Sequence, residues 1–287
     1  MTDFVLSAFA DEIDKDLQTQ MAVLSEHGIK YIEMRGVNGK CVVNYSLKEV
    51  KEIKKQLADR GFKISAVGSP LGKIDITADF KPHLDLFKHT LDIAHILETE
   101  YIRMFSFFIP EGEKPGKYRD QVMERWQQFI ETAAGSRLVL LHENEKDIYG
   151  DTPERCLDLL ETMDCNYFKA IFDPANFVQC DVVTYPDGYN LLKDHIEYMH
   201  IKDALFSDHS VVPSGHGDGK VKEILTDLAR AGYRGFLSLE PHLGSFTGLG
   251  DLEKDSKFID LPDGGPQKFA IAVKALNKII SKIKEEL

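Results

Sequence analysis

The sequence has few cysteines and no long apolar run. Four cysteines stand at positions 41, 156, 165 and 180, and none forms a Cys-x-x-Cys pair. The N-terminal stretch MTDFVLSAFADEIDKD has neither the basic start nor the apolar core of a signal peptide, and is typical of a first strand. We therefore expect a cytoplasmic protein with reduced, structural thiols. No apolar stretch reaches the roughly 18 residues of a membrane span, so no membrane association is expected.

Basic residues are also scarce. The 287 residues include 35 Lys and Arg against 47 Asp and Glu, a formal net charge of −12. Nucleic-acid-binding proteins neutralise phosphates with basic side chains and usually show a basic excess. The acidic balance therefore argues against a DNA or RNA partner. Hydrophobic residues make up 43% and charged residues 29%, which is enough apolar material for a full globular core.

Short apolar runs alternate with longer amphipathic segments along the whole chain. Eight runs are apolar on nearly every side chain and predict strands covered on both faces: residues 4–9, 31–35, 63–69, 101–107, 138–143, 169–173, 196–202 and 235–240. Helical spacing and capping residues predict eight helices: residues 16–28, 46–61, 80–97, 117–134, 153–163, 188–194, 220–231 and 266–286.

Eight strand–helix units without a linker predict parallel pairing with right-handed crossovers. A single domain over residues 1–287, folded as an α/β (β/α)₈ TIM barrel, is favoured, since such barrels need about 250 residues. The alternative is a doubly wound open sheet, which usually has a glycine-rich turn after its first strand. Here that turn reads SAFADEID and contains no glycine.

Ligand-type side chains follow the last four predicted strands. In a (β/α)₈ barrel the active site lies at the C-terminal strand ends, and there the sequence places Glu143, Asp173, His200 and Glu240. One such residue alone is usually a polar strand end, but four in consecutive units indicate a site. Three carboxylates and an imidazole suit Mn²⁺, Mg²⁺ or Co²⁺, with Zn²⁺ as a further option. Without a cation, the carboxylates would repel one another.

The motifs HENE, FDPANF, HIKD and LEPH carry these residues. With them, in this order and spacing, nearly the whole chain resembles the xylose isomerase-like TIM barrel superfamily of sugar isomerases and epimerases. The resemblance implies one divalent metal, Mn²⁺ being favoured, held by Glu143, Asp173, His200 and Glu240. In the ketose 3-epimerases of this superfamily the first and last glutamates also act as acid and base, which assigns that role to Glu143 and Glu240. The family also leads us to expect a homodimer or homotetramer.

The implied activity is isomerisation or epimerisation of a small sugar or sugar derivative. The metal would stabilise the enediolate formed when a proton next to a carbonyl is removed, and a second group would return a proton. One alternative is a metal-dependent lyase or dehydratase of a keto-sugar or keto-inositol. Another is a barrel that binds a sugar without turning it over. Endonuclease IV-like repair enzymes share the barrel, but Asn176 stands where they carry a ligand histidine.

Further polar residues at the strand ends are expected to contact the carbohydrate substrate: Glu33, Arg35, Ser69, Lys73, Arg103, His142, Glu145, Asn176, Lys202, Asp203 and His216. For Glu33 and Arg103, an ion pair with each other is an equally good interpretation. Glu145 shares a strand side with Glu143, whereas His142 points the other way. A hydrogen-bonded structural histidine in the helix layer is therefore favoured for His142.

Two loops complete the expected mouth of the barrel. Residues 211–221 contain glycines at 215, 217 and 219 before a helix, which suggests either a phosphate cradle or a plain turn, the turn being slightly favoured. Residues 244–265 form a long connection of the kind that often acts as a lid or a subunit contact.

Overall fold

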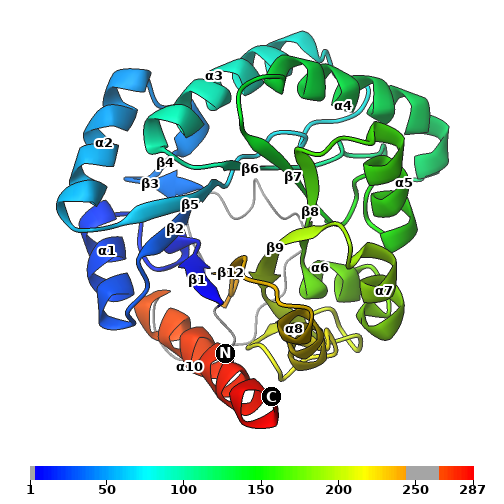
Figure 1. Cartoon of the computed structure of the whole chain (residues 1–287). Coiled ribbons are helices and arrows are strands. Elements are labelled where there is room, and N and C mark those ends of the chain that lie inside the picture. Colours follow the sequence, from blue (N-terminus) through cyan, green and yellow to red (C-terminus); the bar gives the residue numbers. More distant parts are fainter. Residues whose placement is uncertain (1–3, 244–264) are drawn as a thin grey trace.

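A computed structural model describes residues 4–243 and 265–287. Eight parallel strands form one sheet in the order β1-β12-β9-β8-β7-β6-β5-β2. Their bounds are Val5–Ala8 (β1), Tyr31–Met34 (β2), Lys63–Val67 (β5), Tyr101–Met104 (β6), Val139–Glu143 (β7), Phe168–Phe172 (β8), Ile196–Ile201 (β9) and Phe236–Leu239 (β12). The first and last strands of this order lie side by side, so the sheet curls into a nearly closed barrel (Figure 1). The predicted TIM barrel is confirmed.

Helices surround the barrel (Figure 1). The long ones are α1 (Leu17–Glu26), α2 (Leu47–Asp59), α3 (Lys81–Leu97), α4 (Arg119–Ala133), α5 (Pro153–Met163), α8 (Val221–Arg230) and α10 (Gly265–Glu286). The helix expected over residues 188–194 is shorter, a π-type turn η4 (Thr184–Gly188) followed by α7 (Tyr189–Leu192). No helix within residues 4–243 or 265–287 is long and apolar enough to cross a membrane.

Several short elements at the strand ends were not predicted. They are η1 (Ala10–Glu12), the hairpins β3 (Gly36–Val37) with β4 (Lys40–Cys41) and β10 (Asp203–Ala204) with β11 (Val211–Val212), the turns η2 (Val42–Asn44) and η3 (Pro115–Tyr118), and α6 (Pro174–Gln179). Strand β6 is shorter than expected because Phe105 N–H donates to Leu71 O, outside the sheet. These elements shape the mouth of the barrel.

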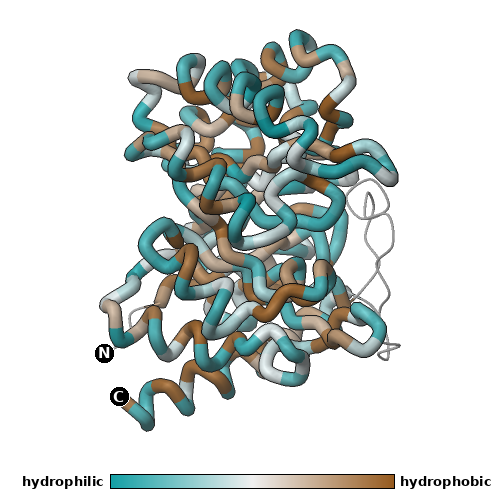
Figure 2. Tube along the Cα trace, turned by 90° about the vertical axis from the view of Figure 1, so that its right-hand side faces the viewer, coloured by the Kyte–Doolittle hydropathy of each residue, from teal (hydrophilic) through white to brown (hydrophobic). Residues whose placement is uncertain are grey.

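The outer helices are held by amphipathic faces and by caps. Helix α10 alternates between hydrophilic and hydrophobic colours along its length in Figure 2, and its buried side chains recur at helical spacing: Phe269, Ala272, Val273, Leu276, Ile279 and Ile283. Ser46 and Glu49 form a capping box at the start of α2, each side chain bonding the other residue's backbone N–H. These local features stabilise the outer helices and their packing against the barrel.

The barrel interior changes from apolar to charged along its axis. Its lower part packs Tyr101, Val139 and Phe236 against a layer of Ala66, Leu141, Ile171 and Tyr198. In the same layer Ser65 Oγ lies 2.6 Å from Ser7 Oγ and 2.9 Å from the Tyr198 hydroxyl, so these buried hydroxyls are mutually satisfied. Above this layer the inward side chains are charged, and they form the site.

Two register shifts adjust which side chains point inward. Ile32 pairs with Ile64, but Glu33 pairs with Ala66, so Ser65 is the extra residue of a bulge. Ala170 pairs with Ile196, but Ile171 pairs with Tyr198, so Glu197 is extra on β9. Bulges near active sites commonly re-aim side chains. Here Ser65 is inserted into β5 opposite Ile32 and Glu33, and Glu197 precedes His200 on β9.

The close approach of Gly72 to β6 gives a test of how the mouth is fixed. Gly72 has φ +91°, and a Cβ there would lie 2.0 Å from Phe105 O. We expect Gly72→Ala to destabilise the protein by about 3 kcal/mol or more, from backbone strain plus the clash. The matched control is Gly112→Ala, where φ is +76° but nothing lies within 4 Å, with an expected cost of about 1 kcal/mol. Urea unfolding measures both, and equal costs would contradict the account.

Candidate metal and active site

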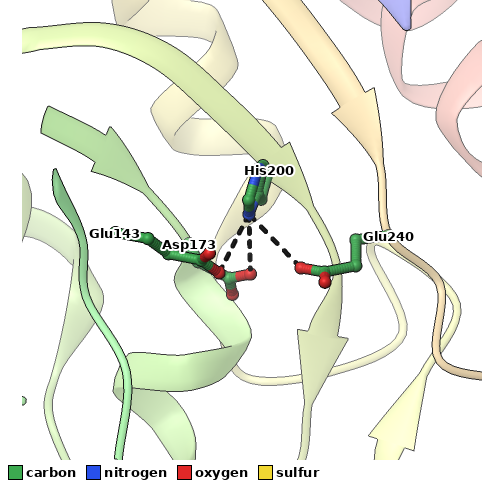
Figure 3. A group of neighbouring side chains, drawn as sticks. All are labelled: Glu143, Asp173, His200 and Glu240. Atoms are coloured by element: carbon green, nitrogen blue, oxygen red, sulfur yellow. Dashed lines mark hydrogen bonds and ion pairs between the residues drawn. The ribbon is translucent and has the colours of Figure 1, made fainter. Parts of the chain in front are cut away.

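Four ligand-type side chains converge at the C-terminal end of the barrel (Figure 3). His200 Nδ1 lies 3.0 Å from Glu143 Oε1, 3.3 Å from Glu240 Oε2 and 3.7 Å from Asp173 Oδ2. One ligand atom from each of the four residues lies within 4.8 Å of the others. All four side chains are almost fully buried. The structure thus brings together the four residues that the sequence singled out as ligands.

Hydrogen bonds from two asparagine side chains, Asn144 and Asn176, hold Glu143 and Asp173 in place. Asn144, next to Glu143, pairs with the backbone of Asp173: its Nδ2 donates to the carbonyl and its Oδ1 accepts from the N–H, both at 2.9 Å. Asp173 Oδ1 accepts from the N–H of Asn176 and caps helix α6. Asn176 Nδ2 donates to Glu143 Oε1 at 3.1 Å. The HENE and FDPANF motifs are therefore one hydrogen-bonded unit across β7 and β8.

The site contains more buried acids than bases among the described residues. Seven carboxylates, each at most 9% exposed, line the mouth: Asp11, Glu12, Glu33, Glu143, Glu145, Asp173 and Glu240. Four buried cationic side chains face them: Arg35, Lys73, Arg103 and Lys202. Buried charges are costly unless they are compensated. The surplus of negative charge makes the cluster a favourable place for a cation.

The electrostatics of the cluster follow from this surplus. Burial alone would lower the pKa of His200, but the carboxylates of Glu143 and Glu33 outweigh burial and raise it well above its ordinary value. Burial would raise the pKa of Glu240, but Lys202 and His242 hold it well below its ordinary value. Glu240 is therefore ionised. A metal entering the cluster must compete with a proton on His200.

Arg35 is the centre of an ionic network that ties Glu240 to the loop after β1. Its Nε lies 2.8 Å from Asp11 Oδ2, one Nη 3.1 Å from Glu12 Oε1, and the other Nη 2.9 Å from Glu240 Oε1. Burial would lower the pKa of Arg35, but these three carboxylates raise it. Arg35 is thus engaged by protein groups. Asp11 and Glu12 were not predicted, although they follow a strand end just as the ligands do.

A second acid–histidine group lies beside this network. Glu12, Glu240 and His242 also bring ligand-type atoms within 4.8 Å of one another. The Arg35 guanidinium contacts both of these glutamates and already supplies positive charge there. His242 Nε2 lies 3.3 Å from each glutamate, and its backbone N–H donates to Glu12. His242 was not predicted as a site residue, although it stands in the LEPH motif two residues after Glu240.

The ion pair between Glu33 and Arg103, one of the two interpretations left open for these residues, is wrong. Arg103 Nη1 instead lies 3.2 Å from Glu143 Oε2 and 3.6 Å from Glu240 Oε1, while Glu33 faces His200. The sequence left this pairing open, because it does not show which side chains reach one another across the mouth of the barrel. Ser69 Oγ donates to the Arg103 carbonyl at 2.5 Å, so it fixes the backbone of β6.

Two lysines at the mouth also have acidic partners. Lys73 Nζ lies 2.9 Å from Glu145 Oε2, and this pair links the β5–α3 and β7–α5 loops. Lys202 Nζ lies 3.3 Å from Asp173 Oδ2 and 3.4 Å from Glu240 Oε2. Lys202 is 1% exposed and pairs with two of the four clustered side chains, so its ammonium belongs to the same buried cluster.

The glycine-rich loop is built around a protein carboxylate. Asp203 accepts hydrogen bonds from the N–H groups of Gly215 (2.8 Å), Gly217 (3.0 Å) and Gly219 (2.9 Å). A Cβ at Gly217 would lie 2.4 Å from Asp203 Oδ1, which explains the glycine. The N–H groups that suggested a phosphate cradle are therefore used internally. His216, on this loop, is exposed. Residues 244–264 of the expected lid lie outside the described residues.

His142 faces the helix layer, the orientation expected from strand alternation. Its Nε2 lies 2.9 Å from Ser106 Oγ, and its ring packs edge-on against Trp126 of α4 at 5.9 Å between centroids. Burial lowers the pKa of His142 to about 3. The imidazole is neutral at pH 7 and is directed away from the four ligand side chains.

The buried neutral His142 predicts a specific sensitivity to acid. The folded-state pKa of about 3 lies below the ordinary value of about 6.5, so between these pH values only the unfolded chain binds this proton. The free energy of unfolding should fall as pH drops, by up to about 1.4 kcal/mol per pH unit from this residue. His83, with a pKa lowered to about 4 by burial and by Arg125, acts in the same direction.

Urea unfolding of metal-free protein between pH 4 and 6 checks this. The variant His142→Gln should show a shallower dependence of unfolding free energy on pH, by nearly one proton. An identical slope in the variant and the wild type would show that His142 is not held neutral.

Comparison with known proteins assigns the chain to a family. A family model described as xylose isomerase-like TIM barrel matches residues 21–260. The chain belongs to the xylose isomerase-like TIM barrel family. A search of curated protein sequences finds no match.

Solved structures share the fold over nearly the full length. A D-tagatose 3-epimerase-like protein is 17% identical, with a TM-score of 0.75 and 99% of each chain covered. The IOLI protein, solved with a zinc atom, is 16% identical, with a TM-score of 0.71 and coverage of 98% of this chain and 99% of that chain. The probable 3-DHS dehydratase AsbF from Bacillus anthracis is 17% identical, with a TM-score of 0.72, covering 96% of this chain and 98% of that one. At these identities the likeness concerns the fold.

Proposed function

We propose that this protein is a divalent-metal-dependent isomerase or epimerase of a small sugar or sugar derivative. The observation that carries the proposal is the convergence of Glu143, Asp173, His200 and Glu240 at the C-terminal end of a barrel of this family. A D-tagatose 3-epimerase-like protein among the structural neighbours supports the reaction class. The zinc atom bound by the IOLI protein supports a metal.

The residues present fit a divalent cation. Asp173 Oδ2 is buried and accepts no aligned hydrogen bond from the described residues, although Lys202 forms an ion pair with it. In both Glu143 and Glu240, one carboxylate oxygen faces His200 Nδ1. The other oxygen pairs with an arginine, Arg103 for Glu143 and Arg35 for Glu240. Oxygen donors with one nitrogen suit Mn²⁺ best, and Mg²⁺, Co²⁺ or Zn²⁺ are alternatives. Glu143, Asp173, His200 and Glu240 would hold the ion.

The two glutamates are placed for proton transfer. When bound, the cation would polarise the substrate carbonyl and so make the neighbouring C–H acidic. Glu143 comes from β7 and Glu240 follows β12, so the two carboxylates flank His200 from opposite sides (Figure 3). One would take the proton from carbon. The other would return a proton to the opposite face in an epimerisation, or to the adjacent carbon in an isomerisation.

A dehydratase is the second candidate. Its supporting observation is Lys202, a buried ammonium beside Asp173 and Glu240 that is placed to protonate a departing hydroxyl. The fold likeness to the probable 3-DHS dehydratase points the same way. Both reactions begin with removal of a proton next to a carbonyl, and product analysis separates them.

Metal binding is the first test. Metal-free protein should bind one Mn²⁺ per chain, more tightly at pH 8 than at pH 6, because the ion competes with the proton on His200. At a free Mn²⁺ concentration about 100 times the Kd, the free energy of unfolding should rise by about 2.7 kcal/mol. Isothermal titration and urea unfolding measure these effects. A folded chain that binds no stoichiometric divalent metal would sink the proposal.

Substitution of the glutamates tests their chemical role. At saturating Mn²⁺, Glu143→Gln and Glu240→Gln should each slow exchange of a keto-sugar C–H proton with solvent deuterium by at least about 100-fold, since an amide cannot accept that proton. NMR follows the exchange across a panel of keto-sugars. Cys165→Ser, a change remote from the cluster, is the control and should exchange normally. Wild-type rates in both glutamine variants would remove these residues from acid–base catalysis.

A further inference from the structure

Glu33 is a buried carboxylate that the proposed proton transfer does not use. Its side chain is fully buried, and its two oxygens lie 3.2 and 3.3 Å from His200 Nε2. The opposite nitrogen of the same ring, Nδ1, faces Glu143, Asp173 and Glu240. Glu33 therefore lies behind the imidazole as seen from the four-residue cluster. This placement does not suit a substrate contact.

The imidazole ring is also restrained on its faces. Phe9 packs against the His200 ring at 79° with 5.2 Å between centroids, and Tyr198 packs at 85° with 5.9 Å. His200 is fully buried, so a ring flip, which would exchange Nδ1 with Cδ2 and Nε2 with Cε1, must displace these aromatic side chains. Packing thus fixes the plane of the ring, but it does not determine which nitrogen carries a proton.

The hydrogen-bonding capacity of the groups determines the proton. An imidazole that ligates a metal must offer an unprotonated nitrogen, and the other nitrogen then carries the N–H. A carboxylate on Nε2 accepts that N–H and leaves the Nδ1 lone pair directed at the other three ligands. On β2, Glu33 lies on the same side as Tyr31, whose ring packs against Phe236 in the lower barrel, so strand alternation directs the Glu33 side chain inward to this position.

We infer that Glu33 is a positioning residue: it accepts the Nε2–H of His200, fixes the imidazole tautomer, and so presents Nδ1 as a metal ligand. The inference rests on the proposed metal-dependent function. It assigns Glu33 to the support of a ligand rather than to contact with the sugar.

Metal affinity tests the inference without any substrate. Loss of such a supporting carboxylate typically weakens metal binding by about 10- to 100-fold. We expect that loss of Mn²⁺ affinity in Glu33→Leu, which removes the acceptor. Glu33→Gln keeps the shape and an acceptor oxygen, so it should recover part of the affinity. The control is Glu197→Gln, on the same strand as His200 but near its other end, where the carboxylate accepts from the Tyr101 hydroxyl, and it should bind Mn²⁺ within about twofold of wild type.

The proton position itself gives a readout that a merely structural role would not move. In wild-type protein loaded with Zn²⁺ and labelled with ¹⁵N-histidine, NMR should show His200 protonated on Nε2 and unprotonated on Nδ1. The signal is assigned by its absence in His200→Asn. A spectrum in which Nε2 carries no proton would overturn the inference. This test uses only the wild-type protein and His200→Asn, so it holds even if Glu33→Leu fails to fold.

The outcomes separate the inference from the proposed function. Wild-type affinity in folded Glu33→Leu, or an Nε2 without a proton in the wild-type protein, would overturn the role of Glu33 alone. A wild-type chain that binds no metal would overturn the proposed function, and with it the inference.

Discussion

The constraint on which this structure depends is the compensation of negative charge buried at one end of the barrel. Carboxylates from β2, β7 and the segments following β1, β8 and β12 meet where water is largely excluded. Such groups repel one another and lose hydration, so the fold requires positive charge in the same place. Part of this charge comes from Arg35, Arg103, Lys73 and Lys202, and a protonated His200 or the proposed divalent cation would supply more. The excess of buried carboxylates over cationic side chains is the reason for proposing a metal-dependent reaction at this site.

Hydrogen bonds and close backbone contacts fix the loops that carry these charged side chains. Asn144 ties the end of β7 to the end of β8, and Asp203 gathers three glycine N–H groups into one loop. Gly72 lets the β5–α3 connection run directly against β6. Each contact fixes a loop that carries or borders an ionic side chain. Metal sites and proton transfers tolerate little displacement, so this rigidity connects the fold to its proposed function.

Much of the fold and the four central residues could be predicted from simple periodicities. Buried parallel strands have continuous apolar runs, and side-chain alternation distinguishes Glu143, which faces inward, from His142, which faces Trp126. The rule that barrel sites lie at C-terminal strand ends then selected one ligand-type residue after each of four strands. These signals are local, and the closed barrel leaves little freedom in how they combine.

The partners of the charged residues could not be predicted, because they depend on how far side chains reach across the barrel and on loops that cross the mouth. A pair between Glu33 and Arg103 was one of two interpretations, but Glu33 faces His200, and Arg103 contacts Glu143 and Glu240 instead. Arg35 was expected to meet the substrate, yet η1 brings acidic side chains against it. The spacing of the glycines in the loop after β9 does not reveal that Asp203 occupies their N–H groups. Sequence indicated which groups are present, and three-dimensional packing determined their pairs.

The central claim is that one divalent cation is held by Glu143, Asp173, His200 and Glu240. The most direct measurement is a crystal structure of protein soaked in Mn²⁺, with anomalous diffraction recorded to locate the metal. The account predicts a single strong anomalous peak within bonding distance of all four side chains. Full-occupancy metal bound elsewhere, or no peak among these four residues, would contradict it.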